Sequence, residues 1–187
     1  MISKEIIEKT KEFGFAQTKE YKRPAAFGID LANRKGQELT EALGSDRDIV
    51  LMGTLLMDCR LGSAISENRI KEHIQISYEA ANEFLSQFPE LNKETKENIL
   101  YCVKQHHGVE KFYSLEAEIC CNADCYKFIS VEGIVGHIRY APDTDLKELT
   151  KRYSLKADEK WNTLTLDMCK KELEPQYKAI KEFLSKF

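Results

Sequence analysis

The spacing of apolar residues constrains this chain more than any other feature, because they recur every three or four positions in most of its segments. That spacing places them on one face of an α-helix, whereas a half-buried strand needs an apolar residue at every second position. The 187-residue sequence contains no alternating stretch of useful length and no internal repeat. A chain of this length can bury one sizeable core and is short for two domains. We therefore predict an all-α, single-domain helical bundle over residues 1–187.

Capping and helix-breaking residues divide the chain into segments. We predict helices over Lys4–Phe13, Phe27–Leu43, Arg47–Cys59, Arg69–Phe88, Lys93–His107, Leu115–Ile129, about Ile134–Tyr140, Asp145–Tyr153 and Asp158–Lys186, with loops at Gly62–Ala64 and Ala141–Asp143. Gly14, Gly44 and Gly108 are expected to end three of the helices, because glycine readily adopts the left-handed conformation of a helix end. Pro175 is expected to kink or interrupt the last helix, because proline removes a backbone hydrogen bond.

Charge and cysteine content exclude several classes of protein. The formal net charge is −3 and charges of both signs are interspersed, so there is no clear nucleic-acid surface. No apolar run approaches the roughly 18 residues that a membrane span needs. Six cysteines at irregular spacings do not resemble a secreted disulfide framework. We expect a cytoplasmic protein with reduced thiols and no membrane partner, and we leave a homo-oligomer open.

A few polar side chains nevertheless fall on the apolar faces of these helices. Ile99, Val103 and His106 follow the spacing i, i+4, i+7, which points His106 inward. Asp124 lies four residues after Cys120 on another apolar face. A buried carboxylate is costly unless it is paired or bound to a metal. The complete set of inward polar residues is Asp58, His73, His106, His107 and Asp124.

Imidazole and carboxylate groups together suit a divalent ion such as manganese, iron, zinc, nickel or magnesium, and a carboxylate can bridge two ions. Such a site favours hydrolysis through a metal-activated water. Two other interpretations stay open. A single inward histidine is more often a hydrogen-bonded core residue, and all five residues could form a buried network without metal. A thiolate of Cys59, Cys121 or Cys125 could also replace an imidazole and favour zinc, although buried cysteines more often act as small apolar residues.

Over roughly Phe27 to Ser130 the sequence resembles the HD-domain superfamily of metal-dependent phosphohydrolases, which is named for a His-Asp pair that ends an apolar helix. The residues that carry the resemblance are the apolar run Ile49–Leu56 leading into Met57-Asp58, the pair Glu72-His73, the segment Ile99–Gly108 ending in Gln105-His106-His107-Gly108, and Ala123-Asp124. The resemblance implies an HD-like all-α core at about 27–130, followed by a C-terminal helical extension at 131–187.

Two histidines of the family are absent. Met57 stands where the family has the histidine of its His-Asp pair, and Gly28 stands near the position of the family's first histidine. The resemblance implies two metal sites that share Asp58. The first keeps only Asp58 and Asp124, whereas the second is complete, with Asp58, His73 and one or both of His106 and His107.

The resemblance thus implies a degenerate HD-domain phosphohydrolase that acts on a phosphorylated small molecule, with a nucleotide as the favoured class. A divalent-metal-activated water would attack the phosphate, with Asp58 and Asp124 as catalytic residues. Arg60, Lys104 and Lys111 lie near the motifs in sequence and are expected to neutralise substrate phosphate. The alternative is a catalytically inactive HD-fold protein that binds a ligand or regulates a partner. Loss of the two family histidines favours that alternative.

Overall fold

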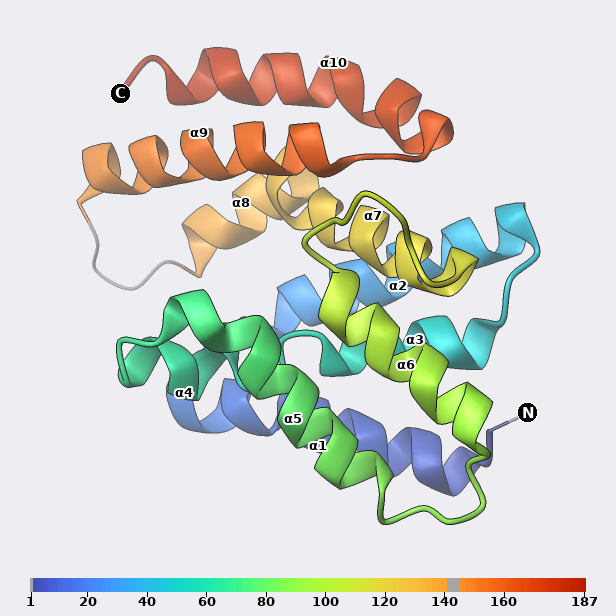
Figure 1. Ribbon diagram of the computed structural model, residues 1–187. Helices are drawn as coiled ribbons and strands as arrows, with labels where there is room; N and C mark the ends of the chain where they lie inside the picture. The colour runs from blue at the N-terminus through green and yellow to red at the C-terminus, as the bar shows by residue number, and fades with distance from the viewer. Residues whose placement is uncertain (1, 141–144) are drawn as a thin grey trace.

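The computed structural model describes residues 2–140 and 145–187, and these residues form helices without a strand (Figure 1). The helices are α1 (Lys4–Tyr21), α2 (Ala26–Leu43), α3 (Arg47–Leu56), α4 (Leu61–Ser66), the 3-10 helix η1 (Ile70–Glu72), α5 (His73–Leu85), α6 (Lys93–Gln105), α7 (Leu115–Ile129), α8 (Val131–Arg139), α9 (Leu146–Thr163) and α10 (Asp167–Leu184). The predicted all-α fold is confirmed. The predicted break at Ala141–Asp143 lies outside the described residues.

Helix α7 is the centre of the bundle. It packs against α2, α3, α6, α8, α9 and α10, and most of its residues are buried. In Figure 1, α9 and α10 lie antiparallel along one side of α7, while α1, α4 and α5 lie on the far side of the molecule. A polar side chain on α7 therefore faces other helices in most directions and has little access to water.

Several predicted helix boundaries are confirmed by their capping contacts. The Asp46 carboxylate accepts hydrogen bonds from the backbone N–H groups of Asp48 (2.9 Å) and Ile49 (3.1 Å) at the start of α3. A side-chain cap of this kind contributes about 1 kcal/mol. Gly44 (φ 75°) and Gly108 (φ 90°) adopt the left-handed conformation after α2 and α6, respectively. These two glycines end their helices as predicted.

Gly14 does not end the first helix, which continues to Tyr21. A Cβ on Gly14 would lie 2.5 Å from the backbone oxygen of Leu55, so this glycine permits close packing of α1 on α3. The loop predicted at Gly62–Ala64 is also wrong, since these residues belong to α4. The long helix predicted from Arg69 starts instead as η1 and becomes α-helical at His73.

The C-terminal helices break at Leu164–Leu166. The breaks predicted between Tyr153 and Asp158 and near Pro175 are both wrong, because α9 and α10 continue through these positions. The Asn122 side chain of α7 accepts hydrogen bonds from the backbone N–H groups of Thr165 and Leu166, both at 3.1 Å, and thereby holds the linker between α9 and α10. Pro175 lies inside α10 on its exposed face, so the hydrogen bond that it removes is lost next to solvent. A tertiary contact, and not a helix breaker in the sequence, therefore separates the last two helices.

The stretch Arg47–Ser66 has the length and mean hydropathy (1.4) of a membrane span, but 67% of it is buried inside this bundle. It comprises two core helices, α3 and α4, separated by a turn at 57–60. The apolar character of the stretch is therefore that of core helices. The turn itself leaves Asp58 between the two helices, at the inner end of α3.

Candidate metal centre

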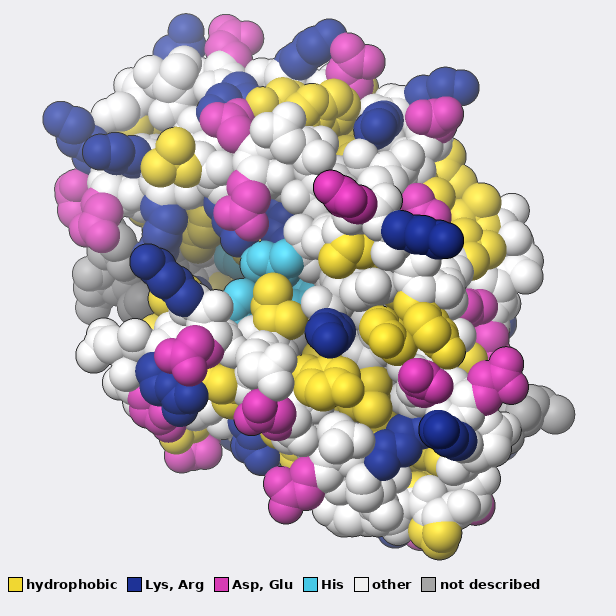
Figure 2. Space-filling view, viewed as in Figure 1, with side chains coloured by type: hydrophobic (Ala, Val, Ile, Leu, Met, Phe, Trp, Pro, Cys, Tyr) yellow, Lys and Arg dark blue, Asp and Glu magenta, His cyan; other side chains and the backbone are white. Residues whose placement is uncertain are grey.

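The five inward polar residues converge on one cavity. Asp58 lies in the turn after α3, His73 begins α5, His106 and His107 follow α6, and Asp124 lies in the middle of α7. All except His106 line a cavity of about 910 Å³ that opens to solvent, and His106 lies fully buried behind them. Figure 2 shows histidine side chains at the bottom of this hollow.

Three imidazoles form the core of the site. One nitrogen from each of His73, His106 and His107 lies within 4.8 Å of the other two. Asp58 Oδ1 is 3.6 Å from His106 Nε2 and 3.9 Å from His73 Nε2. On the far side, Nδ1 of His107 is 3.7 Å from Oε1 of Glu159 on α9. The arrangement offers three nitrogen donors and one carboxylate oxygen within a few ångströms.

Backbone carbonyls determine which nitrogen of two histidines faces the site. Nδ1 of His73 lies 2.7 Å from the Ile70 carbonyl oxygen, and Nδ1 of His106 lies 2.7 Å from that of Val103. Because a carbonyl only accepts, each Nδ1–H donates to it and Nε2 is left with a free lone pair. The buried Nε2 of His106 has no hydrogen-bond partner among the described residues. An unpaired buried acceptor is costly, and metal-ligating histidines are commonly oriented by a carbonyl in this way.

Burial favours the neutral, metal-binding form of two of the imidazoles, those of His73 and His107. Burial, reinforced by repulsion from His106, lowers the pKa of His107 to about 2. Burial also lowers the pKa of His73. Neutral imidazole nitrogens with a carboxylate oxygen suit a divalent transition metal ion. The residues present therefore fit a single ion of this type.

Two lysines that were not predicted complete the site. Lys127 Nζ lies 2.7 Å from Asp58 Oδ2 and 2.5 Å from Asp124 Oδ1, and Lys160 Nζ lies 2.5 Å from Asp124 Oδ2. Burial alone would raise the pKa of Asp124, but the two ammonium groups outweigh it and hold that pKa well below its usual range. The oxygens of Asp124 therefore contact lysines, whereas Asp58 contacts both Lys127 and the histidines.

A sequence signal for both lysines existed. Cys120, Asp124 and Lys127 follow the spacing i, i+4, i+7, and Lys160 lies seven residues after the buried Tyr153. Each lysine thus lies on the inward stripe of its helix. Lysine is rarely buried without a partner, which makes these positions as informative as that of Asp124.

The positions of the missing histidines and the thiols offer no replacement ligand. Gly28 lies beside Lys127, whose Cδ would be 3.5 Å from a Cβ on that glycine, and Met57 is buried with 1% of its surface exposed. Burial raises the pKa of the Cys59 thiol to about 12, and that thiol donates to the Ser77 carbonyl. The cysteine thiols, Cys121 and Cys125 included, are buried and outside the metal-compatible cluster found among the described residues.

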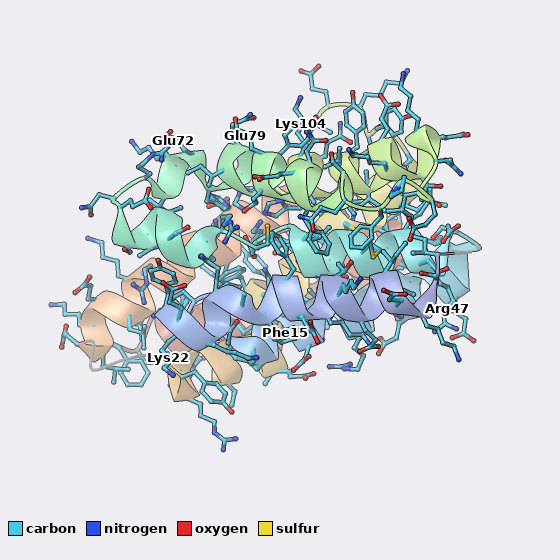
Figure 3. The ribbon with its side chains drawn as sticks, turned by 90° about the horizontal axis from the view of Figure 1, so that it is seen from below. Phe15, Lys22, Arg47, Glu72, Glu79 and Lys104 are labelled. Carbon is cyan, nitrogen blue, oxygen red and sulfur yellow. The ribbon has the colours of Figure 1, made fainter. Side chains whose placement is uncertain are left out.

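The described residues that line the cavity do not include Arg60, Lys104 or Lys111. The Arg60 guanidinium lies over the Phe13 ring, and Lys104 extends outward from α6 (Figure 3). Lys111 is exposed in the loop after α6. Nearness in sequence was a poor guide, because the basic residues that line the cavity come from other segments. They are Arg23, Lys71, Lys127, Lys151, Arg152 and Lys156.

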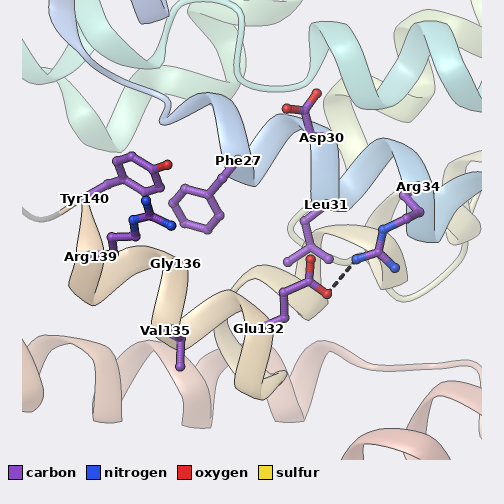
Figure 4. A pocket seen from close by; sticks show the side chains of 9 residues that line it. All are labelled: Phe27, Asp30, Leu31, Arg34, Glu132, Val135, Gly136, Arg139 and Tyr140. Carbon is purple, nitrogen blue, oxygen red and sulfur yellow. Dashed lines mark hydrogen bonds and ion pairs between the residues drawn. The ribbon is translucent and has the colours of Figure 1, made fainter.

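A second cavity, of about 600 Å³, lies between α2 and α8 (Figure 4). Asp30 lines this cavity and does not line the one with the histidines. Phe27 and Tyr140 stack at 5.4 Å at one end, and Arg34 forms an ion pair with Glu132 at the other. Asp30 is close to Gly28 in sequence, but it faces this second cavity and not the histidine cluster.

Comparison with known proteins identifies the fold. A crystal structure described as a predicted HD superfamily hydrolase, from an uncultured Thermotogales bacterium, has a TM-score of 0.69 and 16% sequence identity, covering 96% of this chain and 90% of that chain. A Lactobacillus plantarum protein of known structure has a TM-score of 0.71 and 15% identity, covering 100% and 97% of the two chains. Bacillus subtilis YpgQ, whose structure is also known in complex with ADP, has a TM-score of 0.65 and 14% identity, covering 97% and 93%.

No protein-family model and no curated protein matches this sequence. The similarity therefore concerns the fold, and it includes the C-terminal helices, since it covers 96 to 100% of this chain. The HD-type fold that the sequence resemblance implied is confirmed.

Proposed function

We propose that this HD-fold protein binds one divalent metal ion through His73, His106, His107 and Asp58 and hydrolyses a phosphorylated small molecule. The observation that carries the proposal is the cluster of three imidazole nitrogens within 4.8 Å of one another, beside Oδ1 of Asp58 and next to an open cavity. Nε2 of His137, like that of His106, is buried without a hydrogen-bond partner among the described residues, but His137 lies outside this cluster. Several nitrogens directed at one point are what a metal ion needs.

The protein's own residues would prepare the site for this chemistry. The Ile70 and Val103 carbonyls hold two imidazoles in the tautomer that points Nε2 inward. Lys127 holds the Asp58 carboxylate from the opposite side, so Oδ1 of Asp58 remains directed at the histidines. A divalent ion at these donors would polarise a phosphoryl oxygen and make a bound water acidic enough to attack phosphorus.

The cavity lining supports a phosphorylated substrate. Lys71, Lys151, Arg152 and Lys156 line it, and ammonium and guanidinium groups neutralise phosphate oxygens. The similar fold of YpgQ in a complex with ADP adds support for a nucleotide as the class of substrate. We therefore propose a nucleotide that carries one or more phosphates.

A second candidate function is a ligand-binding or regulatory protein without turnover. The specific observation in its favour is Lys127, which occupies the space between Asp58 and Asp124 where a second ion would be expected from the family resemblance. Hydrolysis with one ion lacks the second cation that stabilises the leaving oxygen in two-metal enzymes. We accordingly expect turnover to be slow.

Metal analysis of the purified protein tests the proposal, because the chain offers a matched control histidine. His137 lines the same cavity but stacks on Phe128 at 4.7 Å and lies outside the three-imidazole cluster. We expect His106→Gln to lose bound manganese or zinc and His137→Gln to retain it, as measured by plasma mass spectrometry after dialysis. Equal retention in both folded variants would contradict the metal centre.

Activity is then measured with manganese on a panel of nucleoside mono-, di- and triphosphates, with phosphate or pyrophosphate release as the readout. We expect slow hydrolysis in the wild type and loss of it in Asp58→Asn. Metal binding without hydrolysis of any nucleotide would favour the ligand-binding alternative. Hydrolysis that persists in Asp58→Asn would exclude the proposed mechanism.

A further inference from the structure

We infer that the ammonium groups of Lys127 and Lys160 take the place of a second divalent cation, so that the centre is built for a single metal ion. The inference rests on the metal centre proposed above. It extends that proposal by stating why the site accepts no second ion and which residues replace that ion.

Each of the four carboxylate oxygens of Asp58 and Asp124 faces a nitrogen-bearing side chain. Oδ2 of Asp58 and Oδ1 of Asp124 contact Lys127, at 2.7 and 2.5 Å. Oδ2 of Asp124 contacts Lys160 at 2.5 Å. Only Oδ1 of Asp58 faces the histidines, at 3.6 and 3.9 Å. A second ion between the two carboxylates would need bonds of about 2 Å to oxygens that already bind Lys127.

The charges lead to the same conclusion. Asp58 and Asp124 are both buried and together carry two negative charges, which must be compensated in a region with little water. Lys127 (6% exposed) and Lys160 (fully buried) together supply two positive charges, which is the charge of one divalent ion. The cluster is therefore neutral without metal. One divalent ion at the histidines already gives it a charge of +2, and a second ion between the carboxylates would raise that charge to +4.

The glycine at position 28 is linked to the same replacement of a metal ion by lysine. A Cβ on Gly28 would lie 3.5 Å from Cδ of Lys127, and this is the closest heavy atom that it would meet outside its own helix. The aliphatic stem of Lys127 thus runs past the position from which a ligand at residue 28 would extend. The small residue at position 28 and the inward lysine at position 127 therefore occur side by side.

The wild-type protein provides the first test. Metal-free protein is titrated with manganese and the stoichiometry is measured by equilibrium dialysis with plasma mass spectrometry. We expect one ion per chain. Two ions per chain would overturn the inference while leaving the proposed metal centre intact. No bound ion would overturn the metal centre itself, and the inference with it, so the two failures are distinguishable.

Variants that restore the family ligands provide the second test. Gly28→His/Met57→His keeps Lys127, and we expect it still to bind one ion, because the ammonium group remains between the carboxylates. Adding Lys127→Gln to this pair removes that charge, and we expect the stoichiometry to rise to two. A second ion bound while Lys127 is present would overturn the inference, and so would a folded triple variant that stays at one.

Thermal denaturation gives a measurement that does not depend on those multiple variants. In Lys127→Met the two carboxylates lose their shared partner, so manganese should raise the unfolding midpoint by more than it does in the wild type. Lys127→Arg retains the charge and serves as the matched control, with a wild-type metal shift. An equal manganese shift in Lys127→Met and wild type would overturn the inference. If Lys127→Met does not fold, the wild-type stoichiometry remains decisive.

Discussion

Replacement of Lys160 by methionine tests whether a buried ion pair holds the C-terminal helices onto the site. The side chain is fully buried on α9, and its ammonium group lies 2.5 Å from Oδ2 of Asp124 on α7. Methionine has a similar length, so little cavity is created and the main effect is a buried carboxylate with one partner fewer. Breaking a buried pair by removing one member costs about 3–5 kcal/mol. Asp124 keeps Lys127 on its other oxygen, so we expect the lower end of that range, about 3 kcal/mol.

Such a loss is readily measured, because domains of this kind are stable by only about 5–15 kcal/mol. At about 2–4 °C per kcal/mol for a chain of this size, the unfolding midpoint should fall by roughly 6–12 °C. Urea unfolding of wild type, Lys160→Met, Asp124→Asn and the double variant forms a complete thermodynamic cycle. We expect the double variant to lose less stability than the sum of the two single losses, by at least about 1 kcal/mol. In the double variant both members of the pair are removed, so neither is left unpaired. Additive losses would refute the pairing argument.

Three further predictions concern other parts of the molecule. Burial lowers the pKa of His137 from 6.5 to about 3, so between these pH values the unfolded chain binds a proton that the folded protein does not. The free energy of unfolding should therefore be unaffected by His137 above pH 6.5 and fall as the pH decreases toward 3, by up to about 1.4 kcal/mol per pH unit. His137→Phe should show a shallower pH dependence in urea unfolding. In Gly14→Ala the new methyl group would lie 2.5 Å from the Leu55 carbonyl oxygen, and we expect a loss of about 1–3 kcal/mol in the same assay; an unchanged midpoint would show that α1 shifts freely. Burial raises the pKa of Cys169 to about 11, so this thiol should resist alkylation at pH 8 in the folded protein and react once urea unfolds it, as measured by mass spectrometry; rapid labelling of native protein at Cys169 would contradict its burial.

Local pattern was sufficient for much of the fold and for the direction of the site residues. The helix Leu115–Ile129 has the bounds that were predicted from the sequence, and Asp124 points inward as expected. His106 is likewise buried at the end of the stripe begun by Ile99. These features follow from helical geometry within about one or two turns, so neighbouring residues determine them.

Some helix ends could not be predicted, because distant contacts decide them. Gly14 resembles a helix end in the sequence, yet α1 continues past it. The glycine instead leaves room for the backbone of Leu55 on α3, which a side chain at position 14 would contact too closely. The break between α9 and α10 depends on Asn122, more than forty residues away in sequence. Neither contact leaves a periodic signal near the residues that it controls.

The site shows the same division between local and tertiary information. The sequence alone determined that Asp58, three histidines and Asp124 turn inward, because periodicity reports the direction of a side chain about its own helix axis. Only the tertiary structure decided that Lys160 meets Asp124 and that Lys127 lies between the two carboxylates. Which buried groups meet depends on how helices far apart in the chain pack together, and that packing is set by the shape of the whole core and not by the period of any one helix.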